Sequence, residues 1–231
     1  MIAVAAPLLA GPLNLNTGTA NWLVTQTSGV SNNGLAVNTT TTAAVLTGVL
    51  PFASNMPGFE QYAWAEVRDG AQWIGQAATD GNFDAGVGCN SSAPTSSCGA
   101  AAGVYVYTLT IRGGFGGSFT LSSFTGDNGI TSLTVTQGSS TLYACDQLEN
   151  GTPNCAASQT STVSSGLIHY WSDTDVTITA IAANYVFQDR NPSGFLLAGL
   201  GFANEVPEPT SYGMFGLAAV ALAVRKYRKI G

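Results

Sequence analysis

The stretch Val104-Tyr-Val-Tyr-Thr-Leu-Thr-Ile-Arg112 decides the fold. Large apolar side chains occupy every second position in it: Tyr105, Tyr107, Leu109 and Ile111. The residues between them are valine and threonine, whose branched side chains favour extended backbone. Because side chains alternate between the two faces of a strand, this period of two predicts a β-strand with one buried face.

Similar short runs lie on both sides of this stretch and are separated by Gly, Asn, Asp and Pro. We expect strands at 22–27, 37–50, 62–67, 72–76, 118–124, 131–137, 167–171, 175–183, 185–187 and 194–202. Arg68-Asp-Gly-Ala71 predicts a hairpin turn, and Gly113 to Gly117 a second turn. No helical period or fixed repeat occurs before the last 27 residues. The pattern predicts an all-β fold, a two-sheet antiparallel jelly-roll-like sandwich.

Charge is scarce and unevenly placed. Charged residues make up 9% of the chain, and four of its seven Lys and Arg lie in the last seven residues. The rest of the chain keeps three arginines against eleven carboxylates before Glu205, a net charge of −8. Such an acidic body has no phosphate-binding footprint, which argues against nucleic acid as a partner.

The four cysteines form two closely spaced pairs, Cys89 with Cys98 and Cys145 with Cys155. In an exported protein each pair predicts a local disulfide that closes one polar loop. A four-cysteine zinc site is the alternative, but the spacings lack the usual C-x₂₋₄-C pattern.

Residues 1–20 are expected to be a remnant of a signal peptide or a lead-in, and residues 21–204 the sandwich domain. Met1 to Pro12 is apolar with small residues, as in the second half of a secretory signal, but lacks a basic start. An ordinary apolar first strand is the alternative interpretation.

Residues 205–231 form a separate tail in three parts. Val206, Pro207, Glu208 and Pro209 make a stiff spacer, the uncharged run 212–224 follows, and Arg225, Lys226, Arg228 and Lys229 end it. The run should be helical in lipid, yet its thirteen residues span roughly 20 Å against roughly 30 Å of hydrocarbon. The basic end should stay cytoplasmic and leave the body outside. The tail therefore predicts a short, marginal C-terminal transmembrane helix.

This order of spacer, apolar run and basic end resembles the PEP-CTERM sorting domain of exported proteins in Gram-negative bacteria. The resemblance covers 27 of 231 residues. It implies recognition by an exosortase, cleavage near the Val206–Pro209 box and a transient inner-membrane anchor before processing. It also implies delivery to the cell surface or to an extracellular matrix of exopolysaccharide and biofilm.

The body carries a second, looser resemblance. The block from Tyr105 to Leu142, together with Gly201-Phe-Ala203, is similar to the galactose-binding-like sandwiches often attached to such tails. This likeness implies a fold rather than an activity.

Catalytic residues are poorly supplied, and we expect neither an enzyme nor a cofactor. The single histidine, His169, lies in an expected strand, and no G-x-S-x-G motif occurs. Glu60 with Glu66, or Asp173 with Asp175, could form a glycosidase pair, but Asp173 and Asp175 read as solvated turn residues.

Sugar binding is the more serious possibility. Trp73, Tyr170 and Trp171 could supply an aromatic platform, with Asp173 or the loop Asp127-Asn128 as hydrogen-bond partners. The alternative is that the tryptophans fill the core.

Asp80, Asn82 and Asp84 have the alternating oxygen ligands of a calcium loop. The pattern then departs from an EF-hand, because Ala85 and Ser91 stand where glycine and glutamate are needed. We therefore expect an Asx-rich turn, with a calcium loop as the alternative.

Together these observations predict an exported, non-catalytic cell-surface or matrix protein. The alternatives are a polysaccharide-binding module and a secreted glycan hydrolase.

Overall fold

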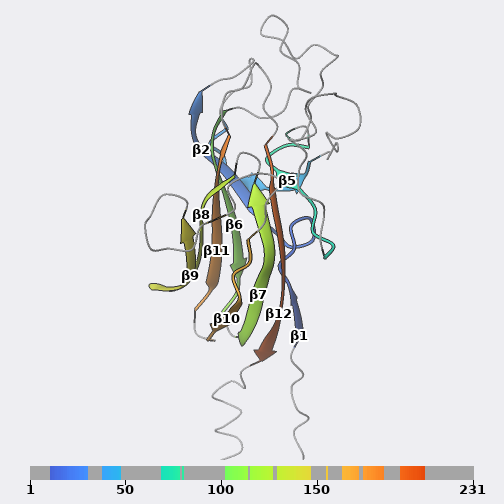
Figure 1. Cartoon of the computed structure of the whole chain (residues 1–231), viewed down its shortest axis with the longest axis vertical. Coiled ribbons are helices and arrows are strands. Elements are labelled where there is room, and N and C mark those ends of the chain that lie inside the picture. The colour runs from blue at the N-terminus through green and yellow to red at the C-terminus, as the bar shows by residue number, and fades with distance from the viewer. Residues whose placement is uncertain are drawn as a thin grey trace, which may run out of the picture.

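The computed structural model describes residues 11–30, 38–47, 69–78, 80, 102–113, 115–126, 129–146, 155, 163–171, 174–184 and 193–205. All regular structure in this part is strand, arranged as two sheets whose strand pairs are antiparallel. The sheets face each other and enclose a core (Figure 1). The expected all-β, two-sheet fold is therefore confirmed, while the expected C-terminal helix lies outside the described residues.

Each sheet is named here after its most central long strand. The β12 sheet has the order β10-β7-β12-β5-β4, with β1 also paired to β12. Its strands are β1 Gly11–Asn14, β4 Val45–Leu46, β5 Ile74–Gly75, β7 Phe115–Gly126, β10 Leu167–Tyr170 and β12 Phe195–Glu205. The β6 sheet has the order β3-β2-β6-β11-β8-β9. Its strands are β2 Leu23–Val30, β3 Thr42–Ala43, β6 Ala102–Ile111, β8 Ile130–Gln137, β9 Ser140–Asp146 and β11 Val176–Asn184.

The period of two in β6 is confirmed. Tyr105, Tyr107, Leu109 and Ile111 are all buried, and the residues between them are only partly buried or exposed. The neighbouring β11 alternates in the same way along its whole length. The alternation therefore sets which face of the β6 sheet meets the β12 sheet.

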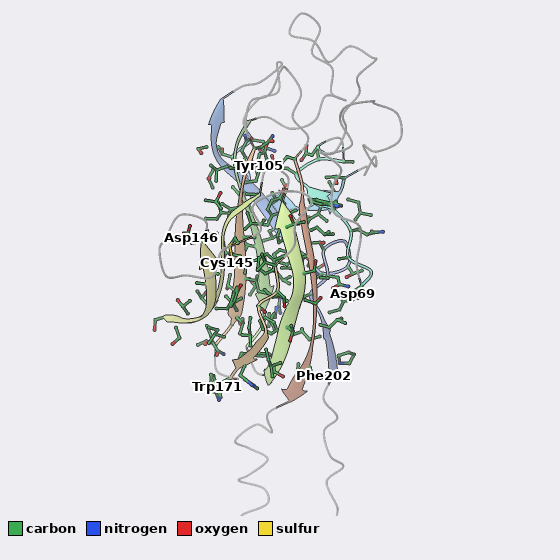
Figure 2. The ribbon with its side chains drawn as sticks, in the orientation of Figure 1. Asp69, Tyr105, Cys145, Asp146, Trp171 and Phe202 are labelled. Carbon is green, nitrogen blue, oxygen red and sulfur yellow. A yellow bond between two sulfur atoms is a disulfide. The ribbon has the colours of Figure 1, made fainter. Side chains whose placement is uncertain are left out.

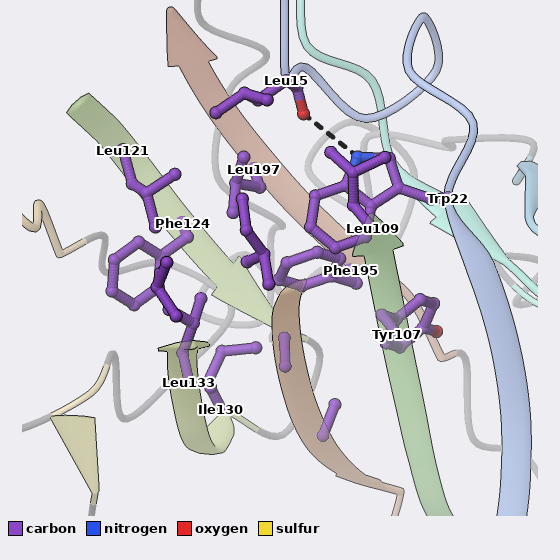
Figure 3. Close-up of a cluster of buried hydrophobic side chains, with 14 of the residues drawn as sticks. Leu15, Trp22, Tyr107, Leu109, Leu121, Phe124, Ile130, Leu133, Phe195 and Leu197 are labelled. Atoms are coloured by element: carbon purple, nitrogen blue, oxygen red, sulfur yellow. Dashed lines mark hydrogen bonds between the residues drawn. The ribbon is translucent and has the colours of Figure 1, made fainter. Parts of the chain in front are cut away.

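Trp22 is buried in the core between the sheets, beside Phe195 and Leu109 (Figure 3). Its ring meets Phe195 edge-on at 5.3 Å between centroids, and Tyr107 stacks on Phe195 at 5.0 Å. The indole Nε1 of Trp22 donates a hydrogen bond of 3.0 Å to the carbonyl of Leu15, so its polar atom is satisfied inside the core.

The folded body begins before residue 21, where the sandwich was expected to start. β1 pairs with β12, Gly11 opposite Ala203 and Asn14 opposite Leu200. Leu15 is 1% exposed and belongs to the main core. Residues 11–20 thus pack with the sandwich. Of the apolar run Met1 to Pro12, the structure describes Gly11 and Pro12, which begin β1.

The strands differ from expectation in two places. The run 37–50 is not one strand: β3 and β4 lie in different sheets, and the chain crosses between them at Ala44. Gly113 to Gly117, expected as a turn, lies where the chain passes from the β6 sheet to the β12 sheet, and the residues from Phe115 on already belong to β7. β9 was not expected at all. In each case sheet pairing, which involves distant residues, decides the outcome.

The Asp-Gly turn is present at its predicted position. Asp69 and Gly70 have φ angles of 52° and 78°, the left-handed region that Gly and Asp tolerate best. The Asn16 side chain holds this turn, donating from Nδ2 to the Asp69 carbonyl at 2.6 Å and accepting from the Gly199 N–H at 2.8 Å. The strand expected at 62–67 lies outside the described residues.

One predicted disulfide is confirmed. Cys145, on β9, is bonded to Cys155, and both residues are buried. Their Cα atoms are 5.3 Å apart. The second predicted pair, Cys89 and Cys98, lies outside the described residues.

Candidate functional site: the expected ligands and the tail-end face

Trp73 fills the body rather than its surface. The side chain is 0% exposed and packs in a small cluster with Ala71, Leu196 and Ala198. Leu196 and Ala198 belong to the first half of β12 and alternate with Phe195 and Leu197, which face the main core. Trp73 and Ala71 therefore pack on the outer face of this half of β12. Trp73 therefore presents no ring face to a sugar, as in the alternative that the tryptophans fill the core.

Tyr170 is also buried, at 3% exposed. Its ring packs against Phe119 with 5.7 Å between centroids. Burial raises the pKa of its hydroxyl above the ordinary value. The hydroxyl has no hydrogen-bond partner among the described residues, and the ring is not accessible as a platform.

Trp171, the next residue, is the opposite case. It is 69% exposed, at the lower end of the sandwich (Figure 2). Its backbone N–H donates to Gln137 Oε1 at 3.0 Å, so the ring projects from a fixed position. Of the expected sugar contacts that are described, Trp171 offers an open ring face; Asp127, Asn128 and Asp173 lie outside the described residues.

Asp80 serves as the acceptor in a tight turn. Its Oδ2 accepts the backbone N–H groups of Gln76 and Ala77 at 2.7 and 2.9 Å. The residue is 5% exposed, and burial raises its pKa to about 6, although the two hydrogen bonds oppose the rise. The expected Asx-rich turn, Asp80 to Asp84, is a different segment and lies outside the described residues beyond Asp80. Asn82 and Asp84 lie outside the described residues, and within the described part no three His, Cys, Asp or Glu gather as metal ligands would.

The Asp80 carboxylate also acts on a neighbouring side chain. Tyr105 is 2% exposed, and its pKa is raised, first by burial and then by the negative charge of Asp80. The backbone carbonyl of Asp80 accepts the Ser193 N–H at 2.8 Å, just before β12. The hydrogen bonds of Asp80 thus join the residues after β5 to the residue that precedes β12 by two positions.

The residues named as catalytic possibilities are not assembled in the described part of the chain. His169 is exposed on β10. Asp175 Oδ1 accepts the Gly113 N–H at 2.6 Å and so ties the β6–β7 crossing to the start of β11. Glu60, Glu66 and Asp173 lie outside the described residues.

A cleft of about 240 Å³ opens beside Trp22. It is lined by Gly18, Thr19, Ala20, Asn21, Trp22, Leu23, Ala43, Ala44, Leu46 and Ile74. None of these residues titrates, and the Trp22 nitrogen is already bonded to Leu15. Besides backbone groups and apolar surface, the cleft offers the uncharged polar side chains of Thr19 and Asn21.

A different surface was missed from sequence, the outer face of the β12 sheet near the end of β12. We call it the tail-end face. Antiparallel partners share a side of the sheet, so the register places two rows on it. One row is Leu167, Thr120, Leu200 and Asn14, and the other is His169, Ser118, Phe202 and Pro12.

Three large apolar side chains of the tail-end face are left uncovered by the other described residues. Leu167, Leu200 and Phe202 are 63%, 56% and 61% exposed. Ser118 and Thr120 lie between them and are short, and Trp171 continues the exposed side of β10. None of these positions is Asp, Glu, Lys or Arg. The register of strands far apart in sequence creates this face, so single-strand patterns could not reveal it.

Comparison with protein families finds one match. The PEP-CTERM protein-sorting motif matches residues 205–229, which begins at the last residue of β12. No curated protein and no solved structure matches the chain. The described residues contain no helix long and apolar enough to span a bilayer. The sandwich therefore leads directly into a sorting motif, whose Val206–Pro209 box and basic end lie outside the described residues.

Proposed function

We propose that the chain is an exported, non-catalytic β-sandwich of a Gram-negative cell surface or extracellular matrix, sorted by an exosortase. The apolar run 212–224 anchors it in the inner membrane until processing near the Val206–Pro209 box releases or transfers the body. The observation that carries the proposal is the match of the sorting motif to residues 205–229.

Two features of the body support the proposal, one for export and one for the absence of catalysis. The Cys145–Cys155 disulfide fits an oxidising compartment, where such bonds persist. The carboxylates of Asp80 and Asp175 accept backbone N–H groups, so these two acids have structural roles rather than catalytic ones.

The test is expression of the full chain in a Gram-negative host that carries an exosortase. We expect the wild-type body to leave the membrane fraction with a loss of mass that matches removal of the tail. Pro207→Ala combined with Glu208→Ala should keep the full mass and stay in the membrane. Pro12→Ala, which changes a proline outside the sorting motif, is the matched control. A wild-type chain found in the cytoplasm with reduced thiols would refute the proposal.

A polysaccharide-binding role after processing is the second candidate, and the observation that favours it is Trp171. Exposed aromatic rings bind sugars by stacking, and this ring is held in place through its backbone. The processed body should be retained on the host's own exopolysaccharide, and Trp171→Ala should abolish retention while Leu46→Ala should not. Equal retention of the two variants would count against this role.

A further inference from the structure

The tail-end face lies where the sorting motif leaves the body. β12 ends at Glu205, the first residue of the matched motif, and Phe202 is labelled beside this end in Figure 2. β1, whose Pro12 pairs with Phe202, begins at the same end (Figure 1). Within the described part of the chain, the apolar side chains of the face thus lie beside the point where the sorting motif begins.

The tether between body and anchor is short. Residues 206–211 separate Glu205 from the apolar run, and six residues span at most about 20 Å when fully extended. β12 has 11 residues, a length of about 36 Å. The body is therefore longer than its tether, which holds the lower end of the sandwich close to the bilayer surface.

The chemistry of this end suits a lipid surface. The body carries a net charge of −8, yet the two rows of the tail-end face contain no carboxylate. Trp and Phe side chains are favoured at the boundary between headgroups and acyl chains. Farther up β12 the outer face is covered by Trp73 and Ala71, whereas no described residue covers Leu200 and Phe202.

We propose that the tail-end face rests on the outer surface of the bilayer while the tail is anchored, with Trp171, Leu200 and Phe202 in the interfacial layer. This inference rests on the proposed anchoring of the tail. The contact turns the outer face of the β12 sheet toward the membrane. It is lost when the tail is cleaved, because the face alone has no anchor, and Trp171 then becomes free.

The test is hydroxyl-radical footprinting of the full chain in nanodiscs of phosphatidylethanolamine and phosphatidylglycerol, read residue by residue by mass spectrometry. Trp171 and Phe202 should be oxidised severalfold more slowly than their exposure predicts. Leu46, which is 48% exposed on β4 at the other end of the β12 sheet, is the internal control and should react at its solvent rate.

Two variants sharpen the result. Leu200→Ser combined with Phe202→Ser removes the apolar surface at exposed positions, and the oxidation of Trp171 should return to its solvent rate. Leu46→Ser, matched in chemistry and exposure, should leave Trp171 protected.

Three outcomes would overturn the inference. A chain that fails to enter nanodiscs refutes the proposed anchoring and this contact with it. An inserted chain in which Trp171 and Phe202 react at solvent rates refutes the contact alone. Protection that appears only when a nanodisc holds more than one copy assigns the face to a second copy of the chain instead.

Discussion

The side-chain amide of Gln137 forms hydrogen bonds with both the backbone N–H and the backbone carbonyl of Trp171. The Trp171 N–H donates to Gln137 Oε1 at 3.0 Å, and Gln137 Nε2 donates to the carbonyl of Trp171. The same Nε2 also donates to the Thr174 carbonyl at 3.2 Å. Gln137 ends β8 in one sheet, and Trp171 follows β10 in the other. A single amide therefore joins the two sheets at the tail end and fixes the exposed tryptophan.

Gln137→Ala should release Trp171 from this position. Loss of the paired bonds should lower the free energy of unfolding by about 1 kcal/mol. The Trp171 amide should also exchange its proton with solvent faster than in the wild type. Gln137→Glu keeps the acceptor for the Trp171 N–H but loses the donor, so a smaller loss is expected. If Gln137→Ala unfolds like the wild type and the amide exchanges at the same rate, the bond is not formed in solution.

Asp80→Asn should change how stability depends on pH. Burial raises the folded pKa of Asp80 to about 6, above its value of 3.8 in an unfolded chain. Between these values the folded state holds a proton that the unfolded state has released, so stability falls as the pH rises. Protonated Asp80 makes its full contribution to the free energy of unfolding below about pH 4. This contribution is at most about 3 kcal/mol and is lost as the pH rises through about 6.

Urea unfolding at pH 4.5, 6 and 7.5 measures this difference. Asp80→Asn keeps an oxygen that can accept the Gln76 and Ala77 N–H groups. Its stability relative to the wild type should therefore increase as the pH rises. Asp80→Ala, which leaves both donors without an acceptor, should be less stable than Asp80→Asn at every pH. A constant gap between the wild type and Asp80→Asn would show that Asp80 does not titrate in this range.

Gly201→Ala should destabilise the sandwich. A Cβ at this position would lie 2.4 Å from Phe119 Cβ and 2.4 Å from the Ser118 carbonyl oxygen, both in the adjacent β7. Such overpacking costs about 1–3 kcal/mol. Gly11→Ala, on β1 with no heavy atom within 4 Å of its added Cβ, is the matched control and should be neutral in thermal unfolding. Equal melting temperatures for the two variants would contradict the close packing of β7 on β12.

Replacing Cys145 and Cys155 together by alanine should cost about 2–3 kcal/mol, as expected for a loop closed over a sequence separation of 10. Chemical denaturation with and without reductant measures the effect. The reductant should lower the stability of the wild type by more than that of the double variant. A wild type that is indifferent to reductant would show that the bond contributes little.

The sequence predicted the strands whose pattern is local. Tyr105 to Ile111 alternate strictly, and the buried face of β6 is the one expected. The Asp69-Gly70 turn and the Cys145–Cys155 bond were likewise predictable, because each depends on residues close together in the chain.

What failed depends on distant partners. β9 reads as Ser-Thr-Leu-Tyr-Ala-Cys-Asp, a mixed run that becomes a strand because β8 pairs with it. The sequence around Trp73 and Trp171 does not show which of the two is buried. Trp73 is buried against the outer face of β12, and Trp171 is exposed. The tail-end face depends on the register of β1, β7, β10 and β12, which no single segment encodes.

The pairing of β12 has a mechanical consequence. This strand carries the sorting motif at its end, and it is held by β7 from Phe195 to Glu205 on one side and by β1 near its end on the other. A pull on the tail runs along β12 and loads these ladders in shear, so many hydrogen bonds must break together rather than one after another. Tension applied through the tail is thus borne by the β7–β12 and β1–β12 ladders.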